Sequence, residues 1–161
     1  MKFHGLAALA LLIGASACTG RDAAATAGND AAQAPRTEVT IASTNGRHVF
    51  RVEVADTVEK QQRGLMYRTG IPKDGGMLFA PYPPEGGGPR EASFWMKNTP
   101  SPLDIIFIRA DGTIARIAEN TVPFSEAQVP SGEPVAAVLE LNGGRSAELG
   151  IAEGDKVSWK R

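Results

Sequence analysis

The chain has 161 residues and a formal net charge of −1, with 17 basic and 18 acidic side chains. This length suits one domain, because domains usually have roughly 100 to 200 residues. A stripe or cluster of Lys and Arg is expected of a nucleic-acid-binding protein. The sequence holds no such stripe or cluster. We therefore expect one small domain that does not bind nucleic acid.

The first 17 residues have the layout of a secretory signal peptide. Lys2 and His4 precede an apolar run from Leu6 to Ile13, which is far short of the roughly 20 residues needed to span a bilayer. Small residues follow and lead to Cys18, the only cysteine of the chain. The sequence thus predicts an exported protein that faces the periplasm.

Two processing routes are open at the end of this leader. Ala15-Ser16-Ala17 is an A-x-A cleavage site that would release a soluble periplasmic or secreted protein. Ser16-Ala17 before Cys18 also resembles the lipobox of bacterial lipoproteins, with Ala15 where leucine is typical. We favour lipidation of Cys18, because a single exported thiol has no partner for a disulfide. Thr19 is not the aspartate that favours the inner membrane, so the outer membrane is the expected destination.

The segment from Cys18 to Arg36 is rich in Ala, Asp, Gly and Gln and has no large apolar residue. Such a composition does not bury enough surface to offset the entropy of ordering. We expect a disordered tether here, followed by a single globular domain over residues 37–161.

The globular part opens with a predicted β-hairpin. Residues from Thr37 onward and from Arg47 to Ala55 alternate apolar and polar side chains, and Asn45-Gly46 marks the turn between them. His48 lies at the end of the apolar face of the second strand. A lone histidine in such a place is more often packed and hydrogen-bonded than catalytic.

A helix, a short strand and a loop come next. Asp56 and Glu59 form a capping-box pattern, which predicts a helix from Thr57 to about Tyr67. Met77-Leu78-Phe79 predicts a short buried strand. The run from Pro81 to Pro89, with three consecutive glycines, predicts an exposed loop, because proline lacks the donor that a sheet interior needs.

The densest signal runs from Phe94 to Thr121. It predicts a strand that ends with Phe94 to Thr99, a strand from Leu103 to Arg109, and a return strand from Thr113 to Thr121. Asp111-Gly112 between two apolar strands favours a two-residue type I′ turn.

Counting outward from that turn predicts the register. Ile108 would oppose Ala115, Ile106 would oppose Ile117, and Asp104 would oppose Glu119. Two facing carboxylates are destabilising unless a cation lies between them or one of them keeps its proton. Two other readings remain open: a β-bulge could send Glu119 to the other face, or both groups could form ordinary ion pairs with Lys97, Arg63 or Arg116.

The remaining chain predicts a long surface loop over residues 121–134, since this segment holds three prolines and little periodicity. A buried strand over Val135–Leu141, a short helix over Arg145–Leu149 and a last strand over Lys156–Lys160 follow. The fold class predicted from these elements is α+β and mostly β, a compact barrel-like or sandwich-like antiparallel or mixed sheet with two short helices.

Six short motifs occur in an order that resembles one known family. They are Arg63-Gly64-Leu65-Met66, Met77-Leu78-Phe79, Phe94-Trp95-Met96-Lys97-Asn98-Thr99, Pro102-Leu103-Asp104-Ile105, Val138-Leu139-Glu140 and Gly154-Asp155. From Thr37 to Trp159 the chain resembles domain of unknown function family 192. The resemblance implies a compact, mostly β fold, often behind a signal peptide or lipid anchor, and it implies no activity. Some members have cysteines where this chain has Val122-Pro123-Phe124-Ser125, so a disulfide or thiol role is not expected here.

Three functions remain open, and they share one set of candidate residues. The first is a binding or accessory module of the cell envelope for a glycan, peptide or protein, since an aromatic face with a few polar groups suits such ligands. The second is a small hydrolase, or an enzyme with a divalent cation at Asp104 and Glu119. The third is a purely structural or protein-docking domain, with Phe94 and Met96 in the core. The candidate binding residues are Arg63, Trp95, Lys97, Asn98, Thr99, Asp104, Glu119 and Glu140.

Overall fold

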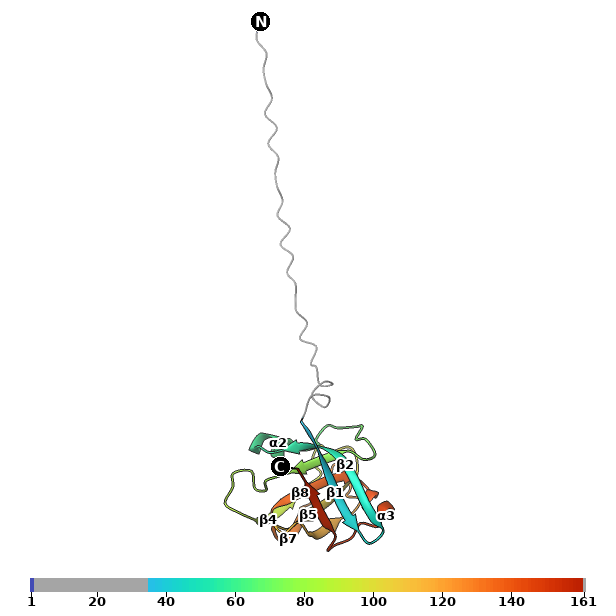
Figure 1. Cartoon of the computed structure of the whole chain (residues 1–161). Coiled ribbons are helices and arrows are strands. Elements are labelled where there is room, and N and C mark those ends of the chain that lie inside the picture. Colours follow the sequence, from blue (N-terminus) through green and yellow to red (C-terminus); the bar gives the residue numbers. More distant parts are fainter. Residues whose placement is uncertain (2–34, 161) are drawn as a thin grey trace.

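The computed structural model describes Met1 and residues 35–160, so the predicted leader, the lipidation site Cys18 and nearly all of the tether lie outside the described residues. The described part is mostly β, with two short helices, as the sequence predicted (Figure 1). The strands are β1 (Arg36–Ser43), β2 (Gly46–Ala55), β3 (Gly76–Phe79), β4 (Arg90–Phe94), β5 (Leu103–Ile108), β6 (Ile114–Ala118), β7 (Val129–Val135), β8 (Ala137–Asn142) and β9 (Lys156–Trp159); the helices are α2 (Val58–Arg63) and α3 (Arg145–Leu149).

Seven strands form one curled sheet in the order β6-β5-β8-β3-β2-β1-β9. Its two edge strands meet, because Thr113 forms an antiparallel bridge with Lys156. Two backbone hydrogen bonds extend this contact: Ile114 N donates to Asp155 O at 2.9 Å, and Val157 N donates to Gly112 O at 2.8 Å. The sheet therefore closes at one end and encloses an apolar interior, in which Val39, Phe50, Leu78, Ile106, Ile108 and Leu139 pack together.

Strand β5 is buried on both faces, which explains why all its residues except Asp104 are apolar. Ile106 and Ile108 point into the enclosed core. Leu103, Ile105 and Phe107 point outward into a second apolar cluster, which also takes in Phe79 and Met96 from other segments. This second cluster forms the base on which the smaller sheet and the region after α2 pack.

The smaller sheet consists of β4 and β7, paired antiparallel. The prediction of a loop over residues 121–134 was wrong at its end, because β7 begins at Val129. Pro130 and Pro134 lie within β7, and a strand with prolines is tolerated at a sheet edge, where not every backbone donor is needed. The predicted strand ending at Thr99 also stops early, at Phe94, because a turn follows in which Asn98 has a φ of 54°.

Helix α2 is shorter than predicted and has a different cap. Thr57 rather than Asp56 is the N-cap, since its side chain accepts from the backbone N–H of Lys60. Asp56 instead pairs with the Lys60 ammonium at 2.6 Å. The helix ends at Gly64, whose φ of 49° and ψ of −137° suit glycine and prevent continuation to Tyr67. Within residues 35–160, no helix is long and apolar enough to cross a membrane.

The β5–β6 hairpin confirms part of the predicted register and corrects the rest. Ile106 pairs with Ile117 as predicted, but Ile108 pairs with Ile114 instead of Ala115, with a register shift after Phe107. Arg109 N donates to Thr113 O at 2.9 Å, and Gly112 has a φ of 82°. These features are those of a three-residue loop with a bulge, not of a two-residue type I′ turn.

Asp104 and Glu119 do not form a shared pair of carboxylates. Glu119 lies in an exposed turn after β6, whereas Asp104 is fully buried. The Asp104 carboxylate accepts hydrogen bonds from the backbone N–H groups of Asn120 at 2.8 Å, Gly144 at 2.8 Å and Ser146 at 2.7 Å. Its charge is therefore compensated by three oriented peptide donors, and neither a cation nor a shared proton is required.

We predict that Asp104→Ala destabilises the domain strongly, because it leaves three backbone donors without their acceptor. Hydrogen bonds to charged groups contribute about 1.5–3 kcal/mol each and are not additive, so a loss of about 3 kcal/mol or more in the free energy of unfolding is expected from urea denaturation. Glu119→Ala is the matched control and should lie within about 0.5 kcal/mol of the wild type. Equal effects of the two substitutions would contradict the assigned role of Asp104.

Candidate functional site

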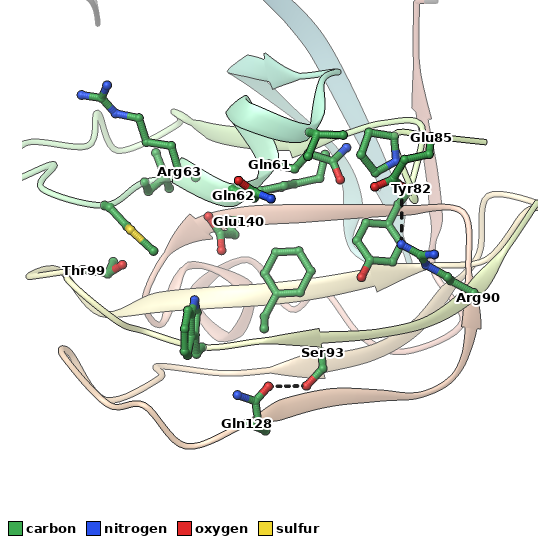
Figure 2. A pocket seen from close by; sticks show the side chains of 18 residues that line it. Gln61, Gln62, Arg63, Tyr82, Glu85, Arg90, Ser93, Thr99, Gln128 and Glu140 are labelled. Carbon is green, nitrogen blue, oxygen red and sulfur yellow. Dashed lines mark hydrogen bonds and ion pairs between the residues drawn. The ribbon is translucent and has the colours of Figure 1, made fainter. Parts of the chain in front are cut away.

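A cavity of about 620 Å³ lies between α2 and β4 (Figure 2). Its volume falls within the range typical of small-ligand sites. One wall comes from α2 and the turn behind it, a second from β4 and its continuation, and the base from β3 and β8. The lining residues are Val58, Gln61, Gln62, Arg63, Gly64, Leu65, Met66, Phe79, Tyr82, Pro84, Glu85, Arg90, Ser93, Phe94, Trp95, Thr99, Gln128 and Glu140.

Glu140 is the acidic group at the base of this cavity. It lies on β8 between Met77 of β3 and Ile105 of β5, its cross-strand partners, and only 5% of its surface is exposed. Its Oε2 atom is buried and has no hydrogen-bond partner. Burial raises the pKa of the Glu140 carboxyl from its ordinary value of 4.5 to about 8, because the apolar surroundings disfavour the charged form. At neutral pH the group is therefore a carboxylic acid, able to donate a hydrogen bond into the cavity.

Gln61 supplies a second buried polar atom that lacks a partner. Its amide nitrogen donates to Ala55 O at 2.9 Å and to Pro81 O at 2.8 Å, which fixes the orientation of the amide group. The oxygen, Oε1, is buried without a hydrogen bond. Buried polar atoms of this kind usually have a partner, so an acceptor held in place and left unused is a feature of a binding site.

An aromatic cluster forms the wall on the β4 side. The Phe94 ring lies 5.0 Å from Phe79 and 6.0 Å from Phe107, both edge to face. Trp95, next in the chain, keeps 40% of its surface exposed. The Lys97 ammonium lies 5.0 Å from the centre of the Trp95 ring. The cavity thus joins an apolar wall to two unpaired polar atoms.

The structure brings together four of the eight candidate residues, since Arg63, Trp95, Thr99 and Glu140 all line the cavity. Figure 2 shows the Arg63 guanidinium directed away from Glu140. Lys97 lies beside the cavity, over Trp95 and 3.9 Å from Glu126.

The other three candidates lie apart from the cavity. Asn98 accepts a hydrogen bond from the backbone N–H of Tyr67 in the turn after β4. Asp104 is saturated by peptide donors, and Glu119 is exposed. His48, outside the cavity, lies 3.0 Å from Ser43 Oγ and 3.1 Å from Asn45 Oδ1.

Sequence reasoning missed Gln61, Tyr82 and Phe94 as parts of the site. Nothing in the sequence marks Gln61, because its environment is created by Ala55 and Pro81 from other segments. Across residues 35–160, no group of three His, Cys, Asp or Glu side chains is arranged to hold a metal ion.

A second cavity, of about 860 Å³, opens near the closed end of the sheet and includes Leu78, Pro83 and Trp159 in its lining. It is larger, but none of the buried side-chain atoms without a partner among the described residues belongs to its lining. We therefore place the candidate site in the cavity of Gln61 and Glu140.

Comparison with known proteins gives a family for this arrangement. The chain matches the profile of DUF192, described as "Uncharacterized ACR", over residues 39–159. The chain belongs to this family. The sequence-based resemblance over Thr37 to Trp159 is thereby confirmed, and the DUF192 match spans both sheets and both helices.

Two solved structures are similar to this DUF192 domain. One, from Novosphingobium aromaticivorans, is described as a protein of unknown function; it is 48% identical with a TM-score of 0.72, and the match covers 77% of this chain and 85% of that chain. The other, from Sinorhizobium meliloti, is described as a "putative transcription regulator"; it is 43% identical with a TM-score of 0.72, and the match covers 78% of this chain and 95% of that chain. No curated protein matches the chain.

We predict that Glu140→Gln flattens the dependence of stability on pH. In the wild type the folded state keeps a proton between pH 4.5 and about 8 that the unfolded state releases, so the stability present at low pH is lost as the pH rises through this window. Each pKa unit corresponds to about 1.4 kcal/mol, so several kcal/mol are lost by pH 8. Urea denaturation should show the variant to be more stable than the wild type at pH 8.5.

The exposed residue Glu91 provides the control, because Glu91→Gln makes the same chemical change outside the cavity lining and should leave the free energy of unfolding at pH 7 within about 0.5 kcal/mol of the wild type. If the free energy of unfolding of Glu140→Gln instead changes with pH in parallel with that of the wild type, the pKa of Glu140 is not raised by burial.

Proposed function

We propose that this DUF192 domain is a ligand-binding module of the bacterial cell envelope, with its binding site in the cavity between α2 and β4. The observation that carries the proposal is the buried carboxyl of Glu140, which faces a cavity and has no partner. Replacing such a group by a well-packed apolar residue is often neutral or stabilising. A polar group that lowers stability and faces an open cavity is best explained by use in binding.

The chemistry of the lining supports an uncharged ligand. Glu140 is neutral at physiological pH, and Gln61 offers an acceptor. Of the charged lining residues, Arg90 and Glu85 form an ion pair with a distance of 3.5 Å, and the Arg63 guanidinium points away from Glu140 (Figure 2). The ligand group that enters the cavity therefore needs both donors and acceptors but no net charge.

The hydrolase alternative has little support from the arrangement of carboxylates. Paired acid and base groups must lie across one substrate, and Asp104 is occupied by three peptide donors while Glu119 is exposed. The same occupancy leaves Asp104 poorly suited to a divalent cation. We propose no binding of nucleic acid, although the Sinorhizobium protein is described as a "putative transcription regulator", because this chain has a net charge of −1 and no basic stripe.

The envelope location rests on the N-terminal sequence. The apolar run from Leu6 to Ile13 and the sole cysteine, Cys18, support export and attachment through a lipid at Cys18, with the outer membrane favoured. Acyl chains would hold the domain at the membrane surface with about 0.8 kcal/mol per buried methylene. The tether behind Cys18 would keep the cavity clear of the lipid headgroups.

We expect Glu140→Leu to separate stability from binding. The variant should unfold at an equal or higher temperature at pH 7, because no carboxyl remains to be desolvated, and it should lose affinity at least tenfold. Binding would be measured by NMR shift perturbation of the ¹⁵N-labelled domain with blocked short peptides and N-acetylated sugars as probes. Failure of every probe to perturb signals around Glu140, or retained affinity in Glu140→Leu, would contradict the proposal.

We predict that Cys18→Ser moves the full-length protein from the membrane fraction to the soluble periplasmic fraction. Serine cannot form the thioether that joins a cysteine to its diacylglyceryl group. Immunoblots of fractionated cells that express the natural leader would measure this, with Ser16→Ala as a control that leaves the cysteine intact. A wild-type protein already in the soluble fraction would favour ordinary cleavage after Ala17.

A further inference from the structure

The ligand class follows from three features of the cavity taken together. They are the free edge of β4, the fixed amide oxygen of Gln61 and the carboxylic acid of Glu140, and they lie on three different sides of one space. This inference rests on the proposed function, because it names what the same cavity binds.

Strand β4 is an edge strand on the side of the cavity. Its strand neighbour is β7, and within residues 35–160 no further backbone-to-backbone hydrogen bond leads from Arg90–Phe94 to another segment. Arg90, Ser93 and Phe94 of β4 line the cavity. The unpaired edge of such a strand is a template on which an extended chain can add as a new strand.

Gln61 lies on the opposite wall, on α2. In an added strand, half of the peptide N–H and C=O groups face the strand to which it pairs, and the other half face away from it. The peptide groups that face away from β4 would face α2, where Gln61 Oε1 is buried and has no hydrogen-bond donor. An extended peptide carries such N–H donors at regular intervals along its length. A compact ligand would instead need hydrogen-bonding groups for both β4 and Gln61 on one small, rigid skeleton.

Glu140 lies on β8, at the base of the cavity. The side chains of an added strand alternate between the two faces of its sheet, so every second side chain of the peptide would point toward the cavity base. The carboxylic acid of Glu140 needs a hydrogen-bond acceptor there. A side-chain amide, from Gln or Asn, supplies that acceptor and carries no charge to desolvate.

We propose that the cavity binds an extended peptide segment of a partner protein, which adds to the free edge of β4 and places a Gln or Asn side chain against Glu140. The exposed Trp95 covers the next part of the peptide. Aromatic residues beside a strand edge supply much of the affinity in such complexes, because they bury a large area with little loss of conformational entropy.

The test uses acetylated and amidated heptapeptides of alternating Val and Thr, with Gln at the central position. Isothermal titration calorimetry with the intact domain should detect binding, and replacement of the central Gln by Leu should weaken it at least tenfold. N-methylation of alternate residues, which removes the donors that face β4, should also weaken binding at least tenfold, whereas methylation of at least one intervening residue should have less effect. Hydrogen exchange of the β4 amides should slow when the peptide is bound.

Two variants, each lacking one exposed aromatic side chain, test whether the peptide binds beside Trp95. Trp95→Ala should weaken peptide binding at least tenfold, and Phe124→Ala, at an aromatic residue with 63% of its surface exposed outside the cavity lining, should leave it unchanged. Thermal denaturation of both variants would verify that they fold.

The outcomes separate this inference from the proposed function. If N-acetylated sugars bind near Glu140 and no peptide does, the peptide proposal fails while the binding function stands. Peptide binding that tolerates N-methylation at every position would overturn strand addition. If neither peptides nor sugars bind the wild-type domain, both proposals fail.

Discussion

The buried carboxylate of Asp104 organises much of this domain. One side chain on β5 accepts hydrogen bonds from three peptide groups, in the turn after β6, in the turn after β8 and at the start of α3. A buried charge is stable only when oriented donors replace its water, and here the donors come from two segments that are distant in the chain, Asn120 in one and Gly144 to Ser146 in the other. The order of these segments around β5 is thereby fixed. The chain that leaves the first of these turns continues past Ser125 to β7, which pairs with the cavity wall β4.

A second buried carboxyl, Glu140, shows the opposite solution to the same problem. Its neighbours on the outer face of the sheet are apolar, and its Oε2 has no partner, so it remains neutral instead of being compensated. The two acids lie on adjacent strands, β5 and β8. Their environments indicate a structural role for Asp104 and a binding role for Glu140, because only Glu140 faces a cavity. Perturbed acids in cavities are typical of functional sites, although structural networks also contain them.

The cavity exists because the outer face of the curled sheet is covered incompletely. The β4–β7 pair packs over the second apolar cluster on one side, and the turn after α2 packs through Leu65 on the other. Gly64 ends the helix early and holds its backbone close to the Phe79 ring, where an added Cβ would approach to 3.3 Å. The space between the β4–β7 pair and the turn after α2 stays open over Glu140. Binding and fold thus depend on the same apolar cluster.

The sequence by itself determined the fold class, the family and most strands, since alternation, long apolar runs and glycine turns are local signals that survive in most contexts. It also selected Trp95, Thr99, Arg63 and Glu140, which do line one cavity. It did not predict β7, because its prolines read locally as a loop and only pairing with β4 makes them an edge strand. The sequence left a β-bulge in the β5–β6 hairpin open, and the structure places one next to the turn, where Ile108 pairs with Ile114 instead of Ala115. Tertiary structure alone decided that Asp104 is satisfied and Glu140 is not, because the partners of a buried carboxyl come from segments distant in the chain.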